Sequence, residues 1–426
     1  MTDFMSAFWI ILTGALVAGA CALAGCFLVL RRLAMLGDAI SHAILPGIVI
    51  AFLLTNSMNV LSMFVGAAAV GLLTTFFVQW LNSSGVQNDA ALGVTFTSLF
   101  ALGVVGVSLF GHAVHLDLDC VLYGEIAYTP FDPLLWNGRY LGPRPVWING
   151  GLFLLNLTVI TLFYKEFKLA AFDPDMAKAV GLPVTFLHYL LMILVALTTV
   201  GAFESVGVIL VTAMLITPPA TAYLLTEKLN RMLIFSVALG ALASLLGYLI
   251  SVQLDCSIAG AMASVCGLLF AAAFLFSPTH GLVIRWIRMR RLRHRVADED
   301  ALLWAHRQWE TEAAHSFTAG QLGESLQWLA SEAHASTRRL NLSGLLNLEK
   351  GRFSLSESGH TKALGLIRAH RLYETYLDEL GYPPDHQHDP ADRVEHHLSP
   401  GLVGELEKAT EHPDKDPQGK IIPTAE

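Results

Sequence analysis

Residues 196–225 read ALTTVGAFESVGVILVTAMLITPPATAYLL, a stretch of 30 residues in which Glu204 is the only charged side chain. A helix needs about 20 predominantly apolar residues to cross the hydrocarbon core of a bilayer. Together with the apolar residues just before it, this stretch is long enough for two crossings. It predicts two membrane-spanning helices, 184–203 and 205–226, that meet near Glu204. The pair Pro218–Pro219 is expected to kink or break the second of them.

Apolar runs of the same kind fill the chain from its N-terminus to about Thr279. The chain is 54% hydrophobic and only 15% charged, whereas soluble proteins contain roughly 25% charged residues. We therefore predict an all-α polytopic membrane protein with about nine transmembrane helices. The expected spans are residues 8–30, 39–54, 60–81, 90–110, 146–164, 184–203, 205–226, 232–252 and 257–276.

The basic residues between these runs predict the orientation of the spans. Short loops rich in Lys and Arg stay in the cytoplasm. Nine spans with the N-terminus outside place all four basic clusters on the cytoplasmic side, namely Arg31–Arg32, Lys165 with Lys168, Lys228 with Arg231, and Arg285–Arg295. We therefore expect a multi-pass protein of the cell inner (plasma) membrane, in contact with membrane lipid, whose polar C-terminal part is cytoplasmic.

The same orientation places the loop 111–145 outside. This loop contains two imidazoles and two carboxylates within eight residues, namely His112, His115, Asp117 and Asp119. They could form an outer capture site or a docking surface, or they could be ordinary solvated polar residues. The sequence leaves their role open.

Asp38 and His42 lie in the segment LAMLGDAISHAILPG (33–47), near the start of the second expected span. Because they are four residues apart, they share one face of a helix. Ionisable residues inside a membrane are costly, and they usually face a transport pathway or a partner. A carboxylate with an imidazole suits a borderline divalent cation. A salt bridge at the helix end, close to Arg31–Arg32, is the alternative.

The chain lacks the GxxxxGK[ST] phosphate-binding motif, so it cannot bind ATP by that route. Energy for transport must come from a separate subunit, from an ion gradient or from the gradient of the substrate. The apolar runs also contain no HExxH motif or other clear catalytic cluster. We therefore expect a transport subunit that is not an enzyme.

Five motifs in the apolar part occur in the order typical of one transporter family. They are DAISHAILPG (38–47), QNDAALGV (87–94), AFDPDMAKAVGLPV (171–184), VGVILVTAMLITPPATAYLL (206–225) and SPTHGL (277–282). On these motifs, residues 1–284 resemble the ABC-3 family of zinc, manganese and iron permeases. The resemblance implies that Asp38 and His42 hold or gate the metal in the permeation pathway. It also implies a second permease copy or a paralogue, an ABC ATP-binding subunit and an extracytoplasmic metal-binding protein.

The cytoplasmic loop 165–183 has the pattern of a short amphipathic helix. Asp173 is placed to cap this helix, Pro174 to occupy its first turn, and Gly181 to end it. The resemblance implies that the loop helix, 172–184, is the coupling helix that meets the ATP-binding subunit. The residues assigned to that contact are Asp173, Met176, Ala177, Val180 and Gly181.

A basic linker (285–297) precedes a tail that contains no cysteine. His370 and Glu374 are four residues apart on one expected helix. A second expected helix, begun by Asp389 and Pro390, carries the positions i+4, i+7 and i+8 counted from His388, namely Asp392, Glu395 and His396. Imidazoles and carboxylates without sulfur suit Mn²⁺, Fe²⁺ or Zn²⁺. A charged, solvated helix face is the alternative.

The tail resembles the DtxR/MntR family of iron- and manganese-dependent repressors. STRRLNLSGLLNLEKGRFSLSESG (336–359) is similar to the end of a winged helix-turn-helix, with two strands around Glu349–Gly351, and HPDKDPQGKIIP (412–423) is similar to the closing segment. The resemblance implies a winged-helix-like region, 298–360, and a metal-binding and dimerisation-like region, 361–426. It assigns metal ligands to His370, Glu374, His388, Asp392, Glu395 and His396, with Asp300 as a further acidic ligand. Leu303 departs from this pattern, because manganese members have a second carboxylate there.

The charge of the tail argues against DNA binding. Between Asp298 and His360, five Lys and Arg residues stand against nine Asp and Glu residues, whereas contact with phosphates needs a basic face. We therefore expect metal sensing and pairing without operator binding.

These observations predict the permease subunit of an ATP-driven importer of a divalent transition metal, with a cytoplasmic metal-sensing tail. Manganese is favoured over zinc and iron by the oxygen and nitrogen ligands. The metal is expected as substrate and regulatory ligand, with no permanently bound cofactor. The alternatives are a permease for a metal chelate and a membrane-tethered, metal-responsive DNA-binding regulator.

Overall fold

The computed structural model of the chain describes residues 2–43, 45–55, 60–110, 126–136, 139–279, 281–310 and 315–424. These residues form two compact units, Met1–Ile284 and Arg285–Glu426. Long apolar helices make up the first unit, and short helices with a small hairpin make up most of the second. The prediction of a helical membrane protein with a largely helical C-terminal domain is confirmed. The outer-loop residues His112, His115, Asp117 and Asp119 lie outside the described residues.

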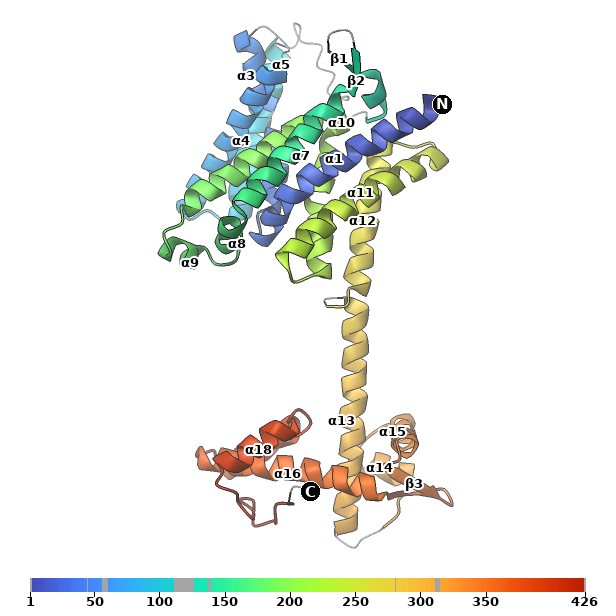
Figure 1. Cartoon of the computed structure of the whole chain (residues 1–426). Helices are drawn as coiled ribbons and strands as arrows, with labels where there is room; N and C mark the ends of the chain where they lie inside the picture. Colours follow the sequence, from blue (N-terminus) through green and yellow to red (C-terminus); the bar gives the residue numbers. More distant parts are fainter. Residues whose placement is uncertain are drawn as a thin grey trace. The chain divides into compact units, whose positions relative to one another are not determined.

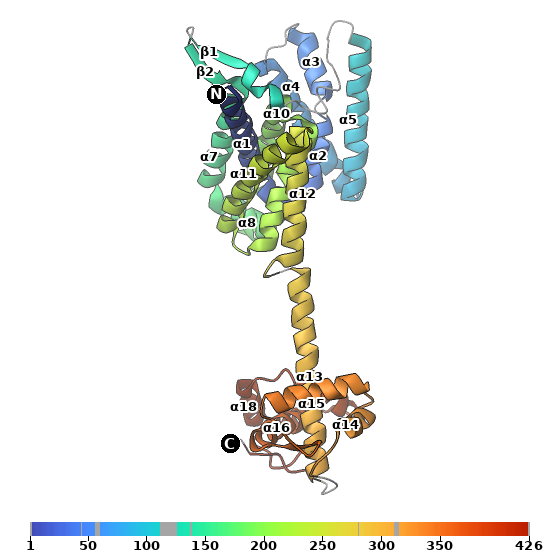
Figure 2. The ribbon, with the colours of Figure 1, turned by 90° about the vertical axis from the view of Figure 1, so that its right-hand side faces the viewer.

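Long helices packed side by side form the body of the first unit (Figure 1). Helix α1 contacts α7, α10 and α11, and α12 packs against α10 and α11. Helices α2 to α5 contact one another as a second group (Figure 2). The helices of this unit are α1 (Thr2–Leu30), α2 (Ala34–Ala43), α3 (Leu45–Thr55), α4 (Val60–Ser83), α5 (Asn88–Phe110), α7 (Arg144–Leu162), α8 (Tyr164–Phe172), α9 (Pro174–Ala179), α10 (Val184–Leu225), α11 (Leu229–Leu254) and α12 (Ile258–Phe276).

Burial divides these helices into a centre and a periphery. In α1, 78% of the most apolar window is buried, and in the first part of α10 67% is buried, against 22% in both α5 and α7. The peripheral helices therefore expose many apolar side chains. Such a surface suits lipid, because lipid tails are as apolar as Leu.

Small residues allow the central helices to approach closely. A Cβ atom added at Gly25 of α1 would lie 1.9 Å from the carbonyl oxygen of Leu215 in α10. The same holds between α3 and α4, where a Cβ at Gly47 would lie 2.4 Å from the carbonyl oxygen of Gly66. Close backbone contact through small residues is how helices associate in lipid, where no hydrophobic driving force acts between them.

Eight helices among the described residues are long and apolar enough to cross a membrane. The structure differs from the prediction at the expected span 39–54, which is divided between α2 and the shorter apolar helix α3. The count of nine spans and their orientation therefore remain predictions.

Helix α10 comprises two helical segments joined at Gly207. Gly207 has φ 77° and ψ 167°, a backbone conformation that residues with a Cβ rarely adopt. The break thus lies close to the expected junction at Glu204. By contrast, the helix continues through Pro218 and Pro219 to Leu225, so of the expected kink or break at the prolines the break does not occur. In spanning helices the backbone groups that a proline frees can be satisfied by neighbouring helices and side chains.

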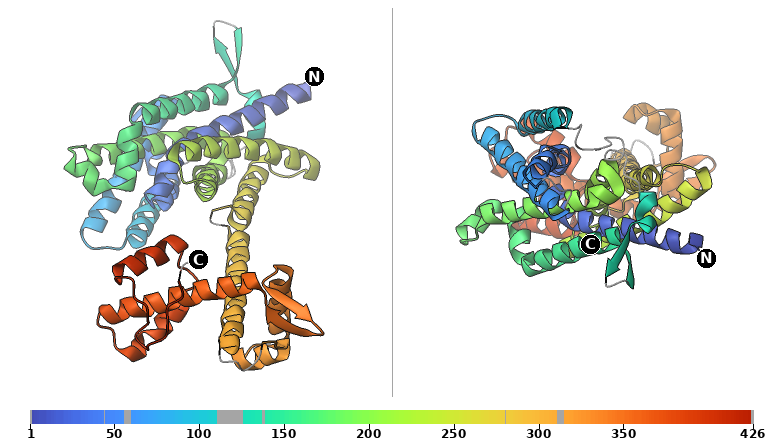
Figure 3. Two further views of the ribbon diagram at one scale, coloured as in Figure 1. Left: turned by 60° about the horizontal axis from the view of Figure 1, so that its bottom comes forward. Right: turned by 90° about the horizontal axis from the view of Figure 1, so that it is seen from above.

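The described residues between α5 and α7 form the 3-10 helix η2 (Ile126–Phe131) and the antiparallel strands β1 (Pro133–Trp136) and β2 (Arg139–Pro143). The hairpin projects from the start of α7 (Figure 3), and η2 packs against α1 and α10.

The second unit begins with most of α13 (Leu282–Glu310) and continues with α14 (Ala319–Leu326) and α15 (Ala330–Leu342). Strands β3 (Leu346–Glu349) and β4 (Arg352–Leu355) follow as an antiparallel hairpin. The hairpin expected around Glu349–Gly351 is therefore present. Its apolar side packs on a small core that includes residues of α13, α14 and α15.

The rest of the second unit is built around α16 (Glu357–Glu379). This helix contacts α17 (His388–Val394), which follows the 3-10 helix η3 (Pro384–His386), and α18 (Pro400–Ala409). Near the C-terminus, Pro423 O accepts a hydrogen bond from Arg368 of α16. The packing brings residues of α13, α16 and the segment after α17 together.

Candidate metal centre

Helix α16 places His370 and Glu374 on one face. The helix begins after Ser356, whose hydroxyl accepts a hydrogen bond of 3.0 Å from the backbone N–H of Gly359, which is a standard N-cap. In the second half of this helix, His370 is 7% exposed and Glu374 is 1% exposed. Buried ionisable groups require partners, so the surroundings of this pair decide what it can do.

The residues after α16 supply those partners, although their helix begins differently from the prediction. Helix α17 starts at His388, with Gln387 as its N-cap residue and no side-chain capping bond. The prediction that Asp389 and Pro390 begin this helix is therefore wrong. The side chain of Gln387 instead donates to Asp378 Oδ1 (2.9 Å) and to a backbone carbonyl (2.7 Å). These bonds fix the chain just before His388, so the helix starts earlier.

The first cluster gathers around the imidazole of His370. Its Nδ1 lies 2.8 Å from Glu395 Oε2 and 3.3 Å from Asp392 Oδ1. Its Nε2 lies 3.1 Å from Glu374 Oε1 and 3.1 Å from His388 Nδ1. His388 Nδ1 in turn lies 2.8 Å from Glu374 Oε1. A second imidazole and three carboxylates thus surround the His370 ring, two groups at each of its nitrogens.

This first cluster is partly open to solvent. Ligand atoms of His370, His388 and Asp392 all lie within 4.8 Å of one another. The side chains of His388 and Asp392 are 56% and 46% exposed, whereas that of His370 is 8% exposed. An ion could therefore enter from the exposed side and be held from the buried side. Nitrogen and carboxylate oxygen without sulfur suit Mn²⁺, Fe²⁺ or Zn²⁺.

A second cluster surrounds His396. Its Nε2 lies 3.1 Å from Asp300 Oδ1 and 3.7 Å from Glu395 Oε1. Its Nδ1 lies 3.0 Å from Glu299 Oε2. Glu395 therefore contacts both clusters, one through each carboxylate oxygen. Sequence reasoning did not identify Glu299, which is separated from His396 by 97 positions; its only local signal is its place beside Asp300.

Glu299 is held firmly in a buried position. It is 2% exposed, and its Oε1 lies 3.1 Å from Arg295 Nε and 3.5 Å from Lys362 Nζ. Arg295 also donates a hydrogen bond of 3.2 Å to the carbonyl oxygen of His396. This arrangement orients the His396 ring through its Nδ1, as carboxylates commonly do for metal-binding histidines.

The carboxylates raise the basicity of both buried imidazoles. Burial alone would lower the pKa of His370, but hydrogen bonds to Glu374 and Glu395 outweigh it and raise this pKa to about 9. Hydrogen bonds to Asp300 and Glu299 raise the pKa of His396 to about 10. An imidazole binds metal only in its neutral form, so a metal ion must displace a proton from each ring.

Leu303 borders the first cluster from α13. It is 5% exposed and lines a cavity of about 440 Å³ together with His370, His388 and Glu395. A carboxylate at this position would point toward the same space. Leu303 itself adds no donor to this cavity. The carboxylates that line it belong to Glu395, Glu310 and Asp416, and the last two lie within 4.0 Å of Arg371.

The membrane candidates Asp38 and His42 both lie in α2, four residues apart. Their side chains are outside the described part of the chain, so the structure gives no contacts for them. That Asp38 and His42 lie on one face follows from their spacing on a helix alone. The ligand role of this pair stays a prediction.

The predicted helix that Asp173 caps is present as α9, and a further short helix, α8, precedes it. The Asp173 side chain caps α9 and accepts a hydrogen bond of 2.9 Å from the backbone N–H of Met176. Gly181 has φ 88° and ends the segment. Met176 and Val180 are exposed, whereas Ala177 is fully buried. The segment therefore exposes the apolar side chains of Met176 and Val180, while Ala177 packs against the rest of the unit.

Two family models match the chain. Residues 1–277 match the ABC 3 transport family, and residues 356–424 match the iron dependent repressor, metal binding and dimerisation domain. The second match contains His370, Glu374, His388, Asp392, Glu395 and His396.

Similar proteins are named as metal transport components. Over 280 residues the chain is 52% identical to the manganese transport system membrane protein MntD of Bacillus subtilis (strain 168), covering 66% of this chain and 95% of that protein. It is 41% identical over 285 residues to the zinc transport system membrane protein TroD of Treponema pallidum (strain Nichols), covering 67% and 77%. The solved structure of PsaBC from Streptococcus pneumoniae in complex with Fab is similar with a TM-score of 0.55 and 33% identity, covering 66% of this chain and 94% of that one.

Proposed function

The chain belongs to the ABC 3 transport family, and from that premise we propose that it is the permease subunit of an ATP-driven importer that carries Mn²⁺ into the cytoplasm. It is a multi-pass membrane protein of the metal-transporting permease class. The observation that carries the proposal is the match over 277 residues together with 52% identity to a protein named as a manganese transport component.

Manganese is the proposed substrate for two reasons. The candidate ligands in the tail are imidazole nitrogens and carboxylate oxygens, which Mn²⁺ accepts more readily than sites rich in sulfur. The relative with 52% identity is named for manganese, whereas the one with 41% identity is named for zinc. Zn²⁺ and Fe²⁺ are the competing substrates, and a transport assay separates the three.

Transport would depend on other subunits. ATP would be hydrolysed by a separate ABC subunit that docks on α8 and α9, with Met176 and Val180 entering a cleft of the partner. An extracytoplasmic metal-binding protein would deliver the ion, and a second permease copy or a paralogue would complete the pathway. Asp38 and His42 would hold the ion in transit.

The tail would act as a metal sensor. Residues 298–360 would form its winged-helix-like region, and residues 361–426 would form its metal-binding and pairing region. The cluster of His370 and the cluster of His396 would bind metal that has accumulated in the cytoplasm, and the bound state would slow further import. This regulation is favoured by the position of both clusters on the polar, cytoplasmic side expected for the tail.

A DNA-reading role fits this tail poorly. On helix α15, the candidate recognition helix, Glu332 lies in the first turn. Arg339 is engaged by Asp298, with distances of 2.7 and 3.0 Å. The basic residues that could meet phosphate are thus few and partly occupied.

The test is uptake of radiolabelled Mn²⁺ by proteoliposomes that contain the permease, its ATP-binding subunit and the delivery protein. ATP-dependent uptake that Zn²⁺ and Fe²⁺ inhibit only weakly would support the proposal. A chain ending at residue 297 provides the control for the tail. It should import at the wild-type rate into a metal-free lumen, which is the cytoplasmic side in this assay, but lose the slowing by Mn²⁺ supplied on that side. Unchanged sensitivity in the shortened chain would exclude the sensor role.

A further inference from the structure

The first half of α13 concentrates positive charge on an exposed helix. Six arginines and one histidine lie in the eleven positions from Arg285 to Arg295. Between Asp255 and Asp298 the chain contains no Asp or Glu. The eleven positions form continuous helix, and all six arginines are exposed. The charge therefore lies on the helix surface, and no acidic residue of the same segment neutralises it.

These arginines have different partners within the second unit. Arg295 serves the second cluster, because its Nε lies 3.1 Å from Glu299 Oε1 and it donates a hydrogen bond of 3.2 Å to the carbonyl oxygen of His396. By contrast, three arginines make no ion pair with a carboxylate among the described residues, namely Arg285, Arg290 and Arg291. Arg290 instead lies 5.1 Å from the centre of the Trp286 ring, a cation–π distance. An anionic partner from outside the unit can therefore reach these three.

The three unpaired arginines surround the helix. Because an α-helix has 3.6 residues per turn, Arg285, Arg290 and Arg291 leave the axis in directions separated by roughly 100–140°. An anionic surface therefore meets an arginine from whichever side it approaches the helix. This arrangement suits an extended layer of negative charge better than a single narrow groove.

The basic segment follows a predicted membrane span closely. Helix α12 has 19 residues, which give a length of about 29 Å and match the roughly 30 Å of the hydrocarbon core. The chain then closes a turn, in which the N–H of Gly281 donates a hydrogen bond of 3.0 Å to Ser277 O, and α13 begins at Leu282. Arg285 and Arg291 follow roughly 5 and 14 Å along that helix. The field of a charged bilayer extends about 10 Å at 0.1 M salt, so the segment begins within its range.

We propose that the segment Arg285–Arg293 of α13 binds the anionic phospholipid headgroups of the leaflet at which α12 ends, the cytoplasmic one in the predicted orientation. Guanidinium groups pair with phosphate through two parallel hydrogen bonds. Clusters of about four to eight Lys and Arg directly after a span attract anionic lipids. This inference goes beyond the proposed function, because it does not depend on which ion the permease carries.

The apolar side chains of the segment favour a membrane over nucleic acid, the other polyanion that arginines attract. Trp286 and Met289 are 60% and 68% exposed. Three residues apart, they lie on one side of the helix. Trp is enriched where headgroups meet acyl chains, and a basic helix with exposed apolar side chains binds at that depth. A DNA backbone offers such side chains no apolar surface.

The experiment measures the lipid selectivity of the full-length chain in phosphatidylcholine bilayers. Spin-labelled phosphatidylglycerol and spin-labelled phosphatidylcholine are the probes, and electron paramagnetic resonance gives the fraction of each that the protein immobilises. At low salt the wild type should prefer phosphatidylglycerol by about fivefold or more, the contribution of one basic residue near an anionic surface. The preference should shrink at 1 M salt, where the field extends only about 3 Å.

A triple variant tests the assignment to α13. Arg285→Gln with Arg290→Gln and Arg291→Gln should reduce the preference to about twofold or less, the remainder coming from the basic loops between the spans. The same three positions changed to Lys keep the charge and should retain the preference. The matched control removes equal charge from exposed positions elsewhere in the second unit, namely Arg338→Gln, Lys350→Gln and Lys408→Gln, and should behave like the wild type.

Four results would overturn the proposal. Equal preference in the wild type and in the triple Gln variant would show that α13 does not meet the headgroups. An equal loss in the matched control would assign the effect to the total charge of the chain. A preference unchanged at 1 M salt would contradict an attraction between charges. Binding of double-stranded DNA that the triple Gln variant loses, without any preference for phosphatidylglycerol in the wild type, would assign the segment to nucleic acid.

Discussion

The membrane unit and the second unit each carry an imidazole and a carboxylate four residues apart on one helix, and in the second unit the structure shows what surrounds the pair. Asp38 and His42 are the only ionisable residues of α2. His370 and Glu374 of α16 are joined by further ligands, including Glu395, that come from outside their helix. Helix geometry places two candidate ligands on one face in either case, and in the second unit long-range packing adds further ones. A site with few ligands would suit an ion in transit, whereas a site with many would suit an ion that is retained.

The strongest way to break this comparison is to remove one of the two candidate ligands on α2. Asp38→Ala or His42→Ala is expected to lower Mn²⁺ uptake by about 100-fold or more, because a lost ligand in lipid cannot be replaced by bulk water. Uptake of radiolabelled Mn²⁺ into proteoliposomes measures the effect, and Mn²⁺ binding to the tail should remain unchanged. Transport at the wild-type rate would assign the pair to a helix-end salt bridge with the arginines before α2.

In the second unit, the comparison can be sharpened by contrasting a shared ligand with an unshared one. Glu395 contacts His370 through Oε2 and His396 through Oε1, whereas His388 contacts only the first cluster. Glu395→Ala should therefore weaken Mn²⁺ binding to both clusters, by about 100-fold. His388→Ala should weaken one cluster and leave a second binding step of wild-type affinity.

Calorimetry on the full-length protein in nanodiscs resolves the two steps. The informative quantity is the number of Mn²⁺ binding steps that each variant loses. Loss of both steps in His388→Ala would show that the clusters form one site. Initial uptake rates into a metal-free lumen provide the control. They should stay at the wild-type level in both variants.

Local sequence patterns predict much of this molecule. Apolar runs of about 20 residues identify the long helices because the bilayer imposes their length. Spacing of four residues places His370 and Glu374 on one face, because the helix repeat fixes side-chain directions. The turn at Glu349–Gly351 is likewise a local signal that the structure confirms. Each of these features depends on residues that are near in sequence.

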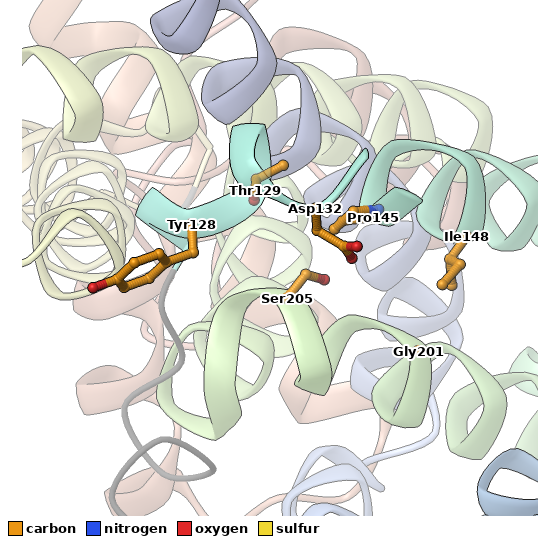
Figure 4. Close-up of a pocket in the computed structure, with 7 residues that line it drawn as sticks. All are labelled: Tyr128, Thr129, Asp132, Pro145, Ile148, Gly201 and Ser205. Carbon is orange, nitrogen blue, oxygen red and sulfur yellow. The ribbon is translucent and has the colours of Figure 1, made fainter. Parts of the chain in front are cut away.

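Features that depend on distant contacts escaped prediction. Glu299 meets His396 only because α13 packs against the segment after α17. Helix α17 begins at His388, and not at Asp389, because Gln387 is held by residues of the preceding turn and of α16. In the first unit, a cavity beside Ser205 likewise assembles residues of η2, α7 and α10 (Figure 4). Sequence spacing contains no information about such encounters.

A change of pH is expected to have a smaller effect on Mn²⁺ binding, and this effect concerns only the two clusters of the second unit. The raised pKa values of His370 (about 9) and His396 (about 10) stabilise the metal-free fold fully below about pH 6.5, the ordinary pKa of histidine. This contribution is lost as the pH rises through 9 and 10. Metal affinity should change in the opposite direction, rising by up to about tenfold per pH unit for each displaced proton.

Calorimetric titrations of Mn²⁺ at pH 6, 7 and 8, repeated in buffers of different ionisation enthalpy, count the released protons directly. Release of one or two protons per ion is expected in the wild type. A binding constant independent of pH in this range would show that the imidazoles do not coordinate the ion.

The smallest expected effect concerns a residue that orients a ligand without being one of the predicted ligands. Glu299→Gln keeps the size of the side chain but removes the charge that lies 3.0 Å from His396 Nδ1 and 3.1 Å from Arg295 Nε. Mn²⁺ binding at the His396 cluster should weaken by about tenfold, the lower end of the range for residues that support a metal ligand. Glu349→Gln, at an exposed position of β3, is the matched control and should bind like the wild type.

Because an orienting carboxylate acts through the ring it holds, the loss in Glu299→Gln should disappear in a His396→Ala background. Equal additional losses in both backgrounds would show instead that Glu299 binds the ion itself, and the second cluster would then resemble the first in recruiting a full set of ligands through long-range packing.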